Sequence, residues 1–445
     1  MKRLSILASA LFLLSALSAS AQIAAKIERE KIAGLDVLVL KTGVKDVVTI
    51  RGSLPAGDAA APEANPALAT LAGGMLDQGT VAQDKYAIAQ KLESVGATLD
   101  FSVDNNVLAI SGKCLRKDVP LVIGLIAEQL RTPRWDPEEF AKLKKQIAGS
   151  LQRSLESTDY RAAQAFNNAV YPAGHPNRNA PTEEFLAASE KATLEEVKAF
   201  HAAYYGPAEL KLVLVGDIDP AGAKAEVARA FAGWTGGKPA VRAAAKARPL
   251  DNAREQTVFM ADKTSVSVVW GTATGMKYTD PDALAFRVGT AILGQGFTGR
   301  LMANVRDKEG LTYGIGARVD NDTFNDGEWR ITATFAPALL EQGITSTRRQ
   351  LTSWFESGVT ADELERRKSN LAGTYKVALS TTGGMASQIL ATLHRGYDLS
   401  FLDEYPQKVE ALKLEQVNGA IKKHLAPDNL VLIKAGTVLD APPAK

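Results

Sequence analysis

The residues best suited to metal binding or hydrolysis are scarce in this sequence. The four histidines are His175, His201, His394 and His424, and no two of them stand four residues apart. Because a helix uses that spacing to place two imidazoles on one zinc ion, we expect no metal site in this chain. His175 precedes a proline in a turn-like segment, where a structural role is expected. The other three are predicted on the polar faces of helices.

Nucleophilic chemistry has as little support. The sequence contains no G-x-S-x-G turn for a serine nucleophile and no Cys–His arrangement of the kind that hydrolases use. Cys114 is the single cysteine and stands at the end of an apparent strand, so it cannot form an intramolecular disulfide. We expect it to be a buried structural thiol.

Two further segments carry residues that could contact a ligand. Gly294–Phe297 is glycine-rich, but it lacks the spacing of a phosphate-binding loop. The second segment, which reads RDKEGLTY, begins at Arg306 and ends at Tyr313. Taken by itself it is a helix end capped by Gly310, with Arg306 a solvated helix residue and Tyr313 a strand residue.

Short strands followed by helices must position these residues. Apolar runs rich in β-branched residues predict strands at Val37–Leu40, Val47–Ile50 and Val266–Trp270. Asp136 begins a predicted helix as its N-cap, and Thr360 opens a capping box. Because strands and helices are mixed rather than strictly alternating, the pattern favours an α+β fold with helices packed to one side of each sheet.

Weak internal repeats divide the chain into two similar halves. Leu194–Val197 is echoed by Leu414–Val417, and Val103–Asn105 is echoed by Val319–Asn321, at nearly constant offsets. Residues 236–256 are rich in Gly, Pro, Ala and charge and have the composition of a flexible basic linker. We therefore expect an N-terminal domain over 22–235, a linker over 236–256 and a C-terminal domain over 257–445.

The N-terminal residues and the net charge indicate where the protein is located and which partners are not expected. Residues 1–21 have a positive start, a short apolar stretch and small residues before Gln22, which predicts a signal peptide cleaved after Ala21. With the low cysteine count, this favours a periplasmic protein without stable membrane insertion. The formal net charge is +2, from 52 basic and 50 acidic residues, so nucleic acid is not an expected partner.

With these features, the sequence resembles the M16 family of zinc peptidases, the inverzincins related to insulin-degrading enzyme, pitrilysin and mitochondrial processing peptidase. The likeness extends over nearly the whole chain after the signal peptide and implies two homologous α+β domains, each with a mostly antiparallel sheet, in a clamshell assembly. The segments that carry it, in order, are Asn65–Ala69, Leu76–Thr80, Leu92–Ala97, Tyr171–Pro176, Leu212–Asp217, Leu293–Leu301 and Arg306–Tyr313.

The same resemblance shows what this chain lacks. Active members carry H-x-x-E-H on a helix just before the Gly-Thr pair that is Gly79-Thr80 here, and the Glu acts as general base on the zinc-bound water. The three motif positions are occupied by Thr70, Gly73 and Gly74, none of which can perform the role. The position of the family's third ligand, a distal Glu, falls near Gly149 or Ser150.

The resemblance also shows what is retained. It implies that Arg306 and Tyr313 face a zinc site across a cavity, the Arg binding a peptide carbonyl and the Tyr donating to the developing oxyanion. It places a second set of residues beside the substrate cleft, namely Gly294, Gln295, Gly296 and Phe297.

The loss of the zinc-binding motif and the retention of Arg306 and Tyr313 together favour a non-catalytic subunit of a heterodimeric zinc peptidase. Its partner would be an M16 subunit that carries H-x-x-E-H and the zinc, and its substrates would be peptides that add to a sheet edge. We expect this chain to bind no cofactor of its own. We also expect it not to hydrolyse peptides when it is alone. Two alternatives remain open: an inert structural scaffold of the same fold, and a stand-alone peptide-binding protein.

Overall fold

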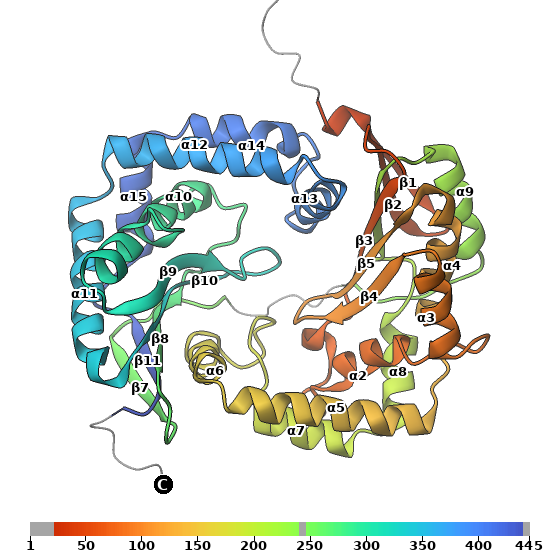
Figure 1. Ribbon diagram of the computed structural model, residues 1–445, viewed down its shortest axis with the longest axis horizontal. Helices are drawn as coiled ribbons and strands as arrows, with labels where there is room; N and C mark the ends of the chain where they lie inside the picture. The colour runs from red at the N-terminus through yellow and green to blue at the C-terminus, as the bar shows by residue number, and fades with distance from the viewer. Residues whose placement is uncertain (1–21, 240–245, 439–445) are drawn as a thin grey trace, which may run out of the picture.

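Two β-sheets, one in each half of the chain, organise the computed structural model (Figure 1), which describes residues 22–239 and 246–438. The predicted signal peptide lies outside the described residues. The first sheet has the spatial order β1-β2-β6-β3-β5-β4 and is antiparallel except for the pair β2 and β6. Its strands are β1 (Ile27–Ile32), β2 (Leu35–Lys41), β3 (Val47–Leu54), β4 (Thr98–Val103), β5 (Leu108–Leu115) and β6 (Lys211–Gly216).

The second sheet repeats this plan with five strands. Its spatial order is β7-β11-β8-β10-β9, with β7 and β11 parallel and the other pairs antiparallel. The strand β9 therefore lies at an edge. The strands are β7 (Arg254–Phe259), β8 (Val266–Ala273), β9 (Thr312–Asp320), β10 (Glu328–Phe335) and β11 (Val431–Gly436). The mostly antiparallel α+β architecture expected from the sequence is confirmed.

Helices surround both sheets, and the longest are α5 in the first half and α11 and α12 in the second. Those of the first half are α2 (Leu68–Leu76), α3 (Lys85–Ser94), α4 (Val119–Arg131), α5 (Pro137–Leu155), α6 (Thr158–Val170), α7 (Thr182–Lys191), α8 (Leu194–Tyr204) and α9 (Pro220–Ala230). Those of the second half are α10 (Ala283–Gly294), the π-helix η4 (Met302–Lys308), α11 (Leu340–Ser357), α12 (Ala361–Ala378), α13 (Thr382–His394), α14 (Phe401–Glu410) and α15 (Leu414–His424).

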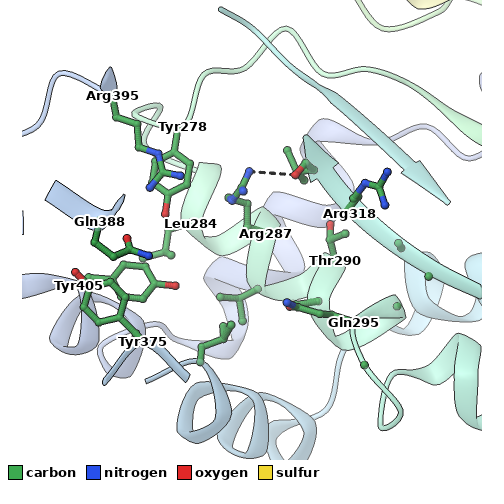
Figure 2. A pocket seen from close by; sticks show the side chains of 18 of the residues that line it. Tyr278, Leu284, Arg287, Thr290, Gln295, Arg318, Tyr375, Gln388, Arg395 and Tyr405 are labelled. Carbon is green, nitrogen blue, oxygen red and sulfur yellow. Dashed lines mark hydrogen bonds between the residues drawn. The ribbon is translucent and has the colours of Figure 1, made fainter. Parts of the chain in front are cut away.

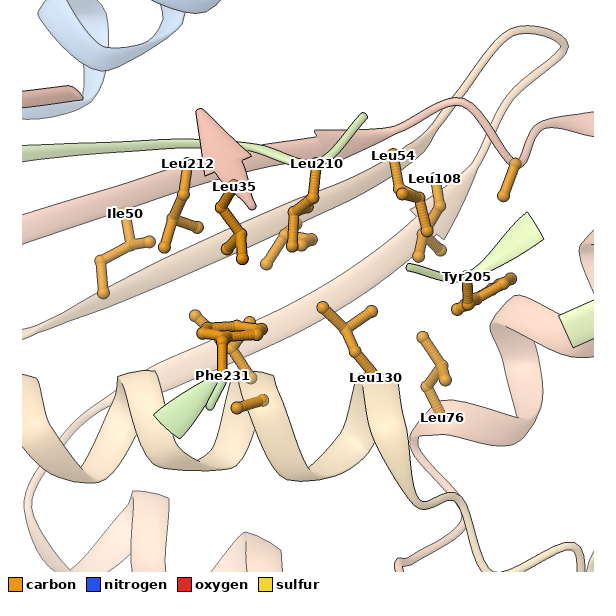
Figure 3. Packing of buried hydrophobic residues seen from close by; sticks show 14 of the residues in the cluster. Leu35, Ile50, Leu54, Leu76, Leu108, Leu130, Tyr205, Leu210, Leu212 and Phe231 are labelled. Carbon is orange, nitrogen blue, oxygen red and sulfur yellow. The ribbon is translucent and has the colours of Figure 1, made fainter. Parts of the chain in front are cut away.

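The core of the first half lies on one face of its sheet, to which alternate side chains of each strand point. Leu35 and Leu212 point from neighbouring strands to one face, where Leu130 of α4 and Phe231, just after α9, pack against them (Figure 3). Because successive side chains of a strand point to opposite faces, the residues between them must be buried by something else. Apart from Asp36, the intervening positions at the centres of β2 and β6 are apolar as well, so both faces of these strands need a cover.

The second face is covered by a helix from the other half of the chain. Leu38 and Val213 of the first sheet pack against Met385 and Ile389 of α13. In return, Phe166 of α6 belongs to the first half but packs against the second sheet, in a cluster that also contains Val269, Ala273, Val431, Ile433 and Ala435. Figure 1 shows both helices beside the opposite sheet. The prediction that helices pack to one side is therefore wrong for the central strands, because their continuous apolar runs require two covers.

A buried polar network also joins the halves. The Tyr171 hydroxyl donates to Glu328, which is 1% exposed and also forms an ion pair with Arg330, with 3.0 Å between Nη1 and Oε1. His175 stacks on Tyr171, with ring centroids 4.8 Å apart, and its Nε2 lies 3.4 Å from Oδ1 of Asp326. The structural role expected for His175 in a turn is confirmed, since its Nδ1 accepts a hydrogen bond from the backbone N–H of Asn177 over 3.1 Å, and the same ring adds a contact between the domains.

Local signals in the sequence are reproduced closely. The three expected strands lie inside β2, β3 and β8. The Asp136 carboxylate accepts hydrogen bonds from the backbone N–H groups of Glu138 and Glu139, and Thr360 forms its capping box with Glu363. Cys114 is buried on β5, and burial raises the pKa of its thiol to about 12, which makes it inert as a nucleophile.

The span between the two sheets is partly anchored. Within the expected linker, the backbone N–H of Ala247 donates to Oδ2 of Asp326 over 2.6 Å, that of Leu250 donates to Thr272, and β7 begins at Arg254. Residues 240–245 of that span lie outside the described residues. Over the described ranges, no helix has both the length and the apolarity needed to cross a bilayer.

Candidate functional site

Arg306 and Tyr313 lie on two elements joined by a short turn. Arg306 is on η4, where the backbone N–H of Glu309 donates to the carbonyl of Asn304, the wider spacing of a π-helix. Gly310 follows with φ +66°, a conformation that favours glycine, and the chain then enters β9 at Thr312. The Cζ atom of Arg306 lies 5.4 Å from the centre of the Tyr313 ring. The structure therefore brings this pair together.

Phe297 completes the group. Its ring centre also lies 5.4 Å from Cζ of Arg306, so the guanidinium faces two aromatic rings. Both rings are exposed, Phe297 to 71% and Tyr313 to 89%. We call Phe297, Arg306 and Tyr313 the Arg306 cluster. Two large exposed aromatic residues beside one cation make this surface a candidate binding site.

The hydrogen-bonding groups of the Arg306 cluster are largely unengaged. Among the described residues, the one ion pair of Arg306 is with the adjacent, half-exposed Asp307, with 3.2 Å between Nη1 and Oδ1. The Tyr313 hydroxyl has no hydrogen-bond partner among the described residues. Most N–H groups of the planar Arg306 guanidinium and the hydroxyl of Tyr313 are therefore free to donate to a carbonyl oxygen or an oxyanion.

The loop that carries Phe297 is held by the second domain. Arg300 donates from Nε and Nη2 to the two carboxylate oxygens of Glu363 on α12, each over 2.7 Å. Gly294 ends α10 against β9, and a Cβ atom there would lie 2.1 Å from the backbone N of Ala317. Gly294 thus serves helix–strand packing within the chain. Gln295 and Gly296 are exposed beside Phe297.

The positions of the lost metal motif lie on α2 and are filled by other side chains. The Thr70 hydroxyl donates to Oδ1 of Asp58 over 2.8 Å. A Cβ atom on Gly73 would lie 2.4 Å from Cγ2 of Val103, and one on Gly74 would lie 2.9 Å from the Cδ atoms of Leu143. Two apolar side chains therefore occupy the space into which longer side chains at these positions would project.

Other residues do not restore a metal site. Gly149 and Ser150, the expected place of the distal Glu, are both on α5. Asp58 is a buried carboxyl next to the lost motif, and its burial raises its pKa to about 6, so it is poorly suited to hold a cation alone. Within residues 22–239 and 246–438, no group of three His, Cys, Asp or Glu side chains is arranged to bind a metal ion.

The histidines are engaged in the fold. Nε2 of His201 lies 2.8 Å from the carbonyl oxygen of Leu130, and that of His394 lies 2.7 Å from the hydroxyl of Ser53. Burial lowers the pKa of each to about 4. Both histidines lie on helices, as predicted, but their partly buried rings turn toward the domain interior rather than toward solvent.

Two sequence profiles match the chain. The profile described as insulinase, peptidase family M16, covers residues 36–176, and the one described as peptidase M16 inactive domain covers residues 191–371. Together they span well over half of the sequence. The chain belongs to peptidase family M16. The first profile includes α2 with the lost motif, and the second includes the Arg306 cluster.

Relatives and solved structures agree with this assignment. A protein named non-peptidase homolog YmxG, from Helicobacter pylori, is 23% identical over 82% of this chain and 83% of its own length. The crystal structure of a peptidase M16 inactive domain from Pseudomonas fluorescens has a TM-score of 0.83 and 25% identity, over 94% of this chain and 100% of that one. The periplasmic protease PqqL from Escherichia coli shares the fold, with a TM-score of 0.72 and 17% identity over 92% of this chain and 46% of PqqL.

Some features of the site have no clear sequence signal. Tyr171 and His175 are part of a motif that the sequence displays, but their partners Asp326 and Glu328 lie some 150 residues further on. A cavity lined by Arg287 and Arg395, described below, is also built from residues far apart in the chain. Periodicity within an element cannot reveal contacts of this kind, since it reports only which face is apolar.

Proposed function

We propose that this protein is the non-catalytic subunit of a heterodimeric periplasmic zinc metallopeptidase that cleaves peptides. It supplies Arg306 and Tyr313 to a zinc site held by its partner. The observation that carries the proposal is the contrast between the two halves. The motif positions of α2 are packed with Val103 and Leu143, while Phe297 and Tyr313 of the Arg306 cluster are exposed and most donors of the cluster are unengaged.

The chemistry assigned to this chain is binding and charge stabilisation. A partner with H-x-x-E-H brings zinc-bound water as the nucleophile. Arg306 donates hydrogen bonds to a peptide carbonyl and holds the substrate in place. The Tyr313 hydroxyl donates to the oxyanion that develops on the attacked carbonyl, an interaction that contributes about 2.7–4 kcal/mol where it has been removed from other enzymes.

An extended peptide suits the surroundings of the Arg306 cluster. Tyr313 is the second residue of β9, and β9 is an edge strand with one side free of a neighbouring strand. Backbone N–H and C=O groups on such an edge can pair with a substrate strand, which gives affinity with little dependence on substrate sequence. Substrate choice in this proposal is therefore broad.

Export to the periplasm is part of the proposal and rests on residues 1–21. Their positive start, apolar stretch and small residues before the cleavage position are the support. The inert, buried thiol of Cys114 is compatible with an oxidising compartment, since it offers no partner for an unwanted disulfide.

Reconstitution tests the function directly. The mature chain is mixed with zinc and with an exported M16 subunit that carries H-x-x-E-H, sought first in the adjacent reading frame. Cleavage of a quenched fluorescent peptide is then followed. We expect hydrolysis that requires both chains and saturates at a one-to-one ratio. Equal rates with and without this chain would contradict the proposal. Stable co-purification with proteins other than peptidases would instead favour a scaffold.

A further inference from the structure

A cavity of ≈ 480 Å³ lies beside β9, between α10 and the helices α12 to α14. It is distinct from the Arg306 cluster, although Gln295 and Gly296 reach its rim. Figure 2 shows the side chains that line it, with Arg395 beside Tyr278 and with Tyr375 and Tyr405 next to each other. A volume of this size is in the range of pockets that hold small ligands or one or two residues of a peptide.

The cavity has an excess of positive charge. The Cζ atoms of Arg287 and Arg395 lie 4.7 and 3.6 Å from the centre of the same ring, that of Tyr278. One buried carboxylate balances this pair: Nη1 of Arg287 lies 2.5 Å from Oδ2 of Asp322, which is 4% exposed. Asp322 is paired with Arg287 and lies outside the lining, and the described residues that line the cavity include no Asp or Glu.

Arg395 is the group that lacks a partner. Its side chain makes no hydrogen bond or ion pair within the described residues, and its Nε atom is buried without an acceptor. Leaving a buried donor unsatisfied costs free energy, and more so when the donor is charged. A ligand oxygen that reached this guanidinium would remove that cost, so the geometry favours an anionic occupant.

Neutral donors also line the cavity. The hydroxyl of Tyr405 and the side-chain amide of Gln388 have no hydrogen-bond partner among the described residues, whereas the Tyr375 hydroxyl donates to the carbonyl of Leu402. Burial raises the pKa of Tyr405 to about 12, so its hydroxyl keeps its proton at neutral pH. Arginine, phenol and amide donors facing one space are suited to a carboxylate, which accepts several hydrogen bonds at once.

The cavity lies along the strand that begins at the Arg306 cluster. Gly316–Val319 of β9 form part of its lining, and Tyr313 stands at the start of the same strand. A strand rises about 3.3 Å per residue, so the cavity is about five residues, or ~17 Å, from Tyr313. A peptide paired with this edge would reach both places.

We propose that this cavity binds a carboxylate of the peptide substrate, about five residues from the bond that is cleaved. The identity of the ligand as a peptide rests on the proposed function; the preference for a carboxylate rests on the cavity alone. The carboxylate belongs either to the C-terminus of the peptide or to an acidic side chain, and the two sources are distinguished by experiment.

Binding of matched peptides to the full mature chain tests the inference without a partner subunit. An eight-residue peptide of Ala, Leu, Ser and Gly with a neutral coumarin label is made in three forms. One has a free C-terminal carboxylate, one a C-terminal amide, and one a C-terminal amide with a single internal Glu. Fluorescence anisotropy gives each Kd. We expect at least a tenfold lower Kd for one or both carboxylate forms than for the neutral form.

Variants locate the site. Arg395→Gln removes the unpaired guanidinium without stranding an acid, whereas a change at Arg287 would leave Asp322 unpaired. We expect Arg395→Gln to abolish the difference between charged and neutral peptides while the Kd of the neutral peptide stays the same. Arg229→Gln, an exposed change on α9 in the other half, is the matched control and should keep the preference.

The outcomes are separable from those of the proposed function. Equal Kd values for the three peptides, no measurable binding, or a preference that survives in Arg395→Gln overturn the inference. If Arg395→Gln does not fold, competition on the unaltered chain decides: N-acetylphenylalanine should displace the charged peptide at a concentration at least tenfold lower than its amide does. The role of Arg306 and Tyr313 is judged by hydrolysis in the mixture, so either proposal can fail while the other stands.

Discussion

The guanidinium of Arg306 faces the rings of Phe297 and Tyr313, and both contacts measure 5.4 Å. Cation–π contacts at exposed sites contribute about 0.5–1 kcal/mol each, enough to favour one orientation of a long side chain. The Arg306 guanidinium is thereby pre-organised, while most of its N–H groups remain without a hydrogen-bond partner among the described residues. Pre-organised donors act on developing charge without first having to reorient, which is the property that a transition-state contact requires.

Removing single donors from the Arg306 cluster should slow the reconstituted enzyme. We expect Tyr313→Phe to lower kcat about 10²-fold, because the lost hydroxyl contributes an oxyanion hydrogen bond. Arg306→Ala should lower kcat/KM by a comparable factor through weaker substrate positioning. Both are measured by peptide hydrolysis in the mixture with the partner.

The controls for these variants are exposed residues of the same type. Tyr86→Phe on α3, 74% exposed, and Arg366→Ala on α12 should leave the rate unaltered. Since Tyr313 is 89% exposed, its replacement should change the free energy of unfolding by no more than about 0.5 kcal/mol. Full activity in both cluster variants would show that the pair does not contribute to catalysis.

A substitution at Gly73 tests how tightly the space beside the lost metal motif is packed. We expect Gly73→Ala to destabilise the protein by about 1–3 kcal/mol, because the new methyl group would overlap Val103 in a packed core. Gly124→Ala on α4 is the matched control, since a Cβ atom there meets nothing within 4 Å, and it should be neutral or stabilising by up to about 1 kcal/mol. Urea unfolding gives both values. A neutral Gly73→Ala would mean that the space beside α2 is still open.

At the scale of elements, the two domains exchange helices. Helix α13 covers one face of the first sheet and α6 covers one face of the second, so neither sheet is fully buried by its own half. The strands β2 and β6 show why: their apolar residues occupy consecutive positions, and each face needs a cover. The exchange ties the orientation of the domains to the folding of each one.

A truncation on α13 should therefore weaken the whole molecule. Ile389→Ala removes a side chain that is 1% exposed and packs on the first sheet, and should cost about 2–5 kcal/mol of unfolding free energy. Unfolding should remain a single transition, because the helix belongs to both cores. Val377→Ala on α12, where the side chain is 70% exposed, should have little effect. Calorimetry that resolved two separate transitions in Ile389→Ala would argue that the domains fold independently.

At the scale of the whole molecule, polar contacts complete the joint between the domains. His394 of α13 contacts Ser53 of β3, and Tyr171 and His175 of the first half meet Glu328 and Asp326 of the second. Buried polar groups of this kind are costly when a partner is missing, so they favour one arrangement of the domains over others. A fixed arrangement suits the proposed role of a subunit that presents a surface to a partner.

Acidification should loosen this joint through His394. Burial, with help from Lys211 and Arg395, lowers its folded-state pKa to about 4, below the ordinary value of 6.5. Between these values the unfolded chain binds the extra proton and the folded chain does not. Stability is therefore present above pH 6.5 and is lost as pH falls toward 4, by up to about 1.4 kcal/mol per pH unit.

The comparison that isolates this effect is His394→Gln, which can still bond to Ser53 but does not titrate. Asp58, whose pKa is raised to about 6, changes stability in the opposite direction over part of this window, so the difference between the two proteins is the relevant quantity. Thermal unfolding from pH 7 to 5 should show a flatter decline of Tm in the variant. Parallel curves would contradict the assignment.

Much of the local structure could be predicted because its causes are local. Strand propensity placed β2, β3 and β8, and the N-caps at Asp136 and Thr360 fall where side-chain oxygens meet free N–H groups. The candidate pair at Arg306 and Tyr313 was also accessible, through its place in a recognisable order of motifs. The rest depends on long-range contacts: no pattern within α6 or α13 reveals that each covers the other domain's sheet.

Residue identity and order alone establish the two-domain α+β plan, the membership of peptidase family M16 and the loss of zinc-binding side chains at Thr70, Gly73 and Gly74. Only the tertiary structure decided that Val103 and Leu143 fill the vacated space, that Phe297 joins Arg306 and Tyr313, and that Arg287 and Arg395 meet in one cavity. The physical reason is that packing and charge act between side chains close in space, and the chain brings those together only when its elements dock.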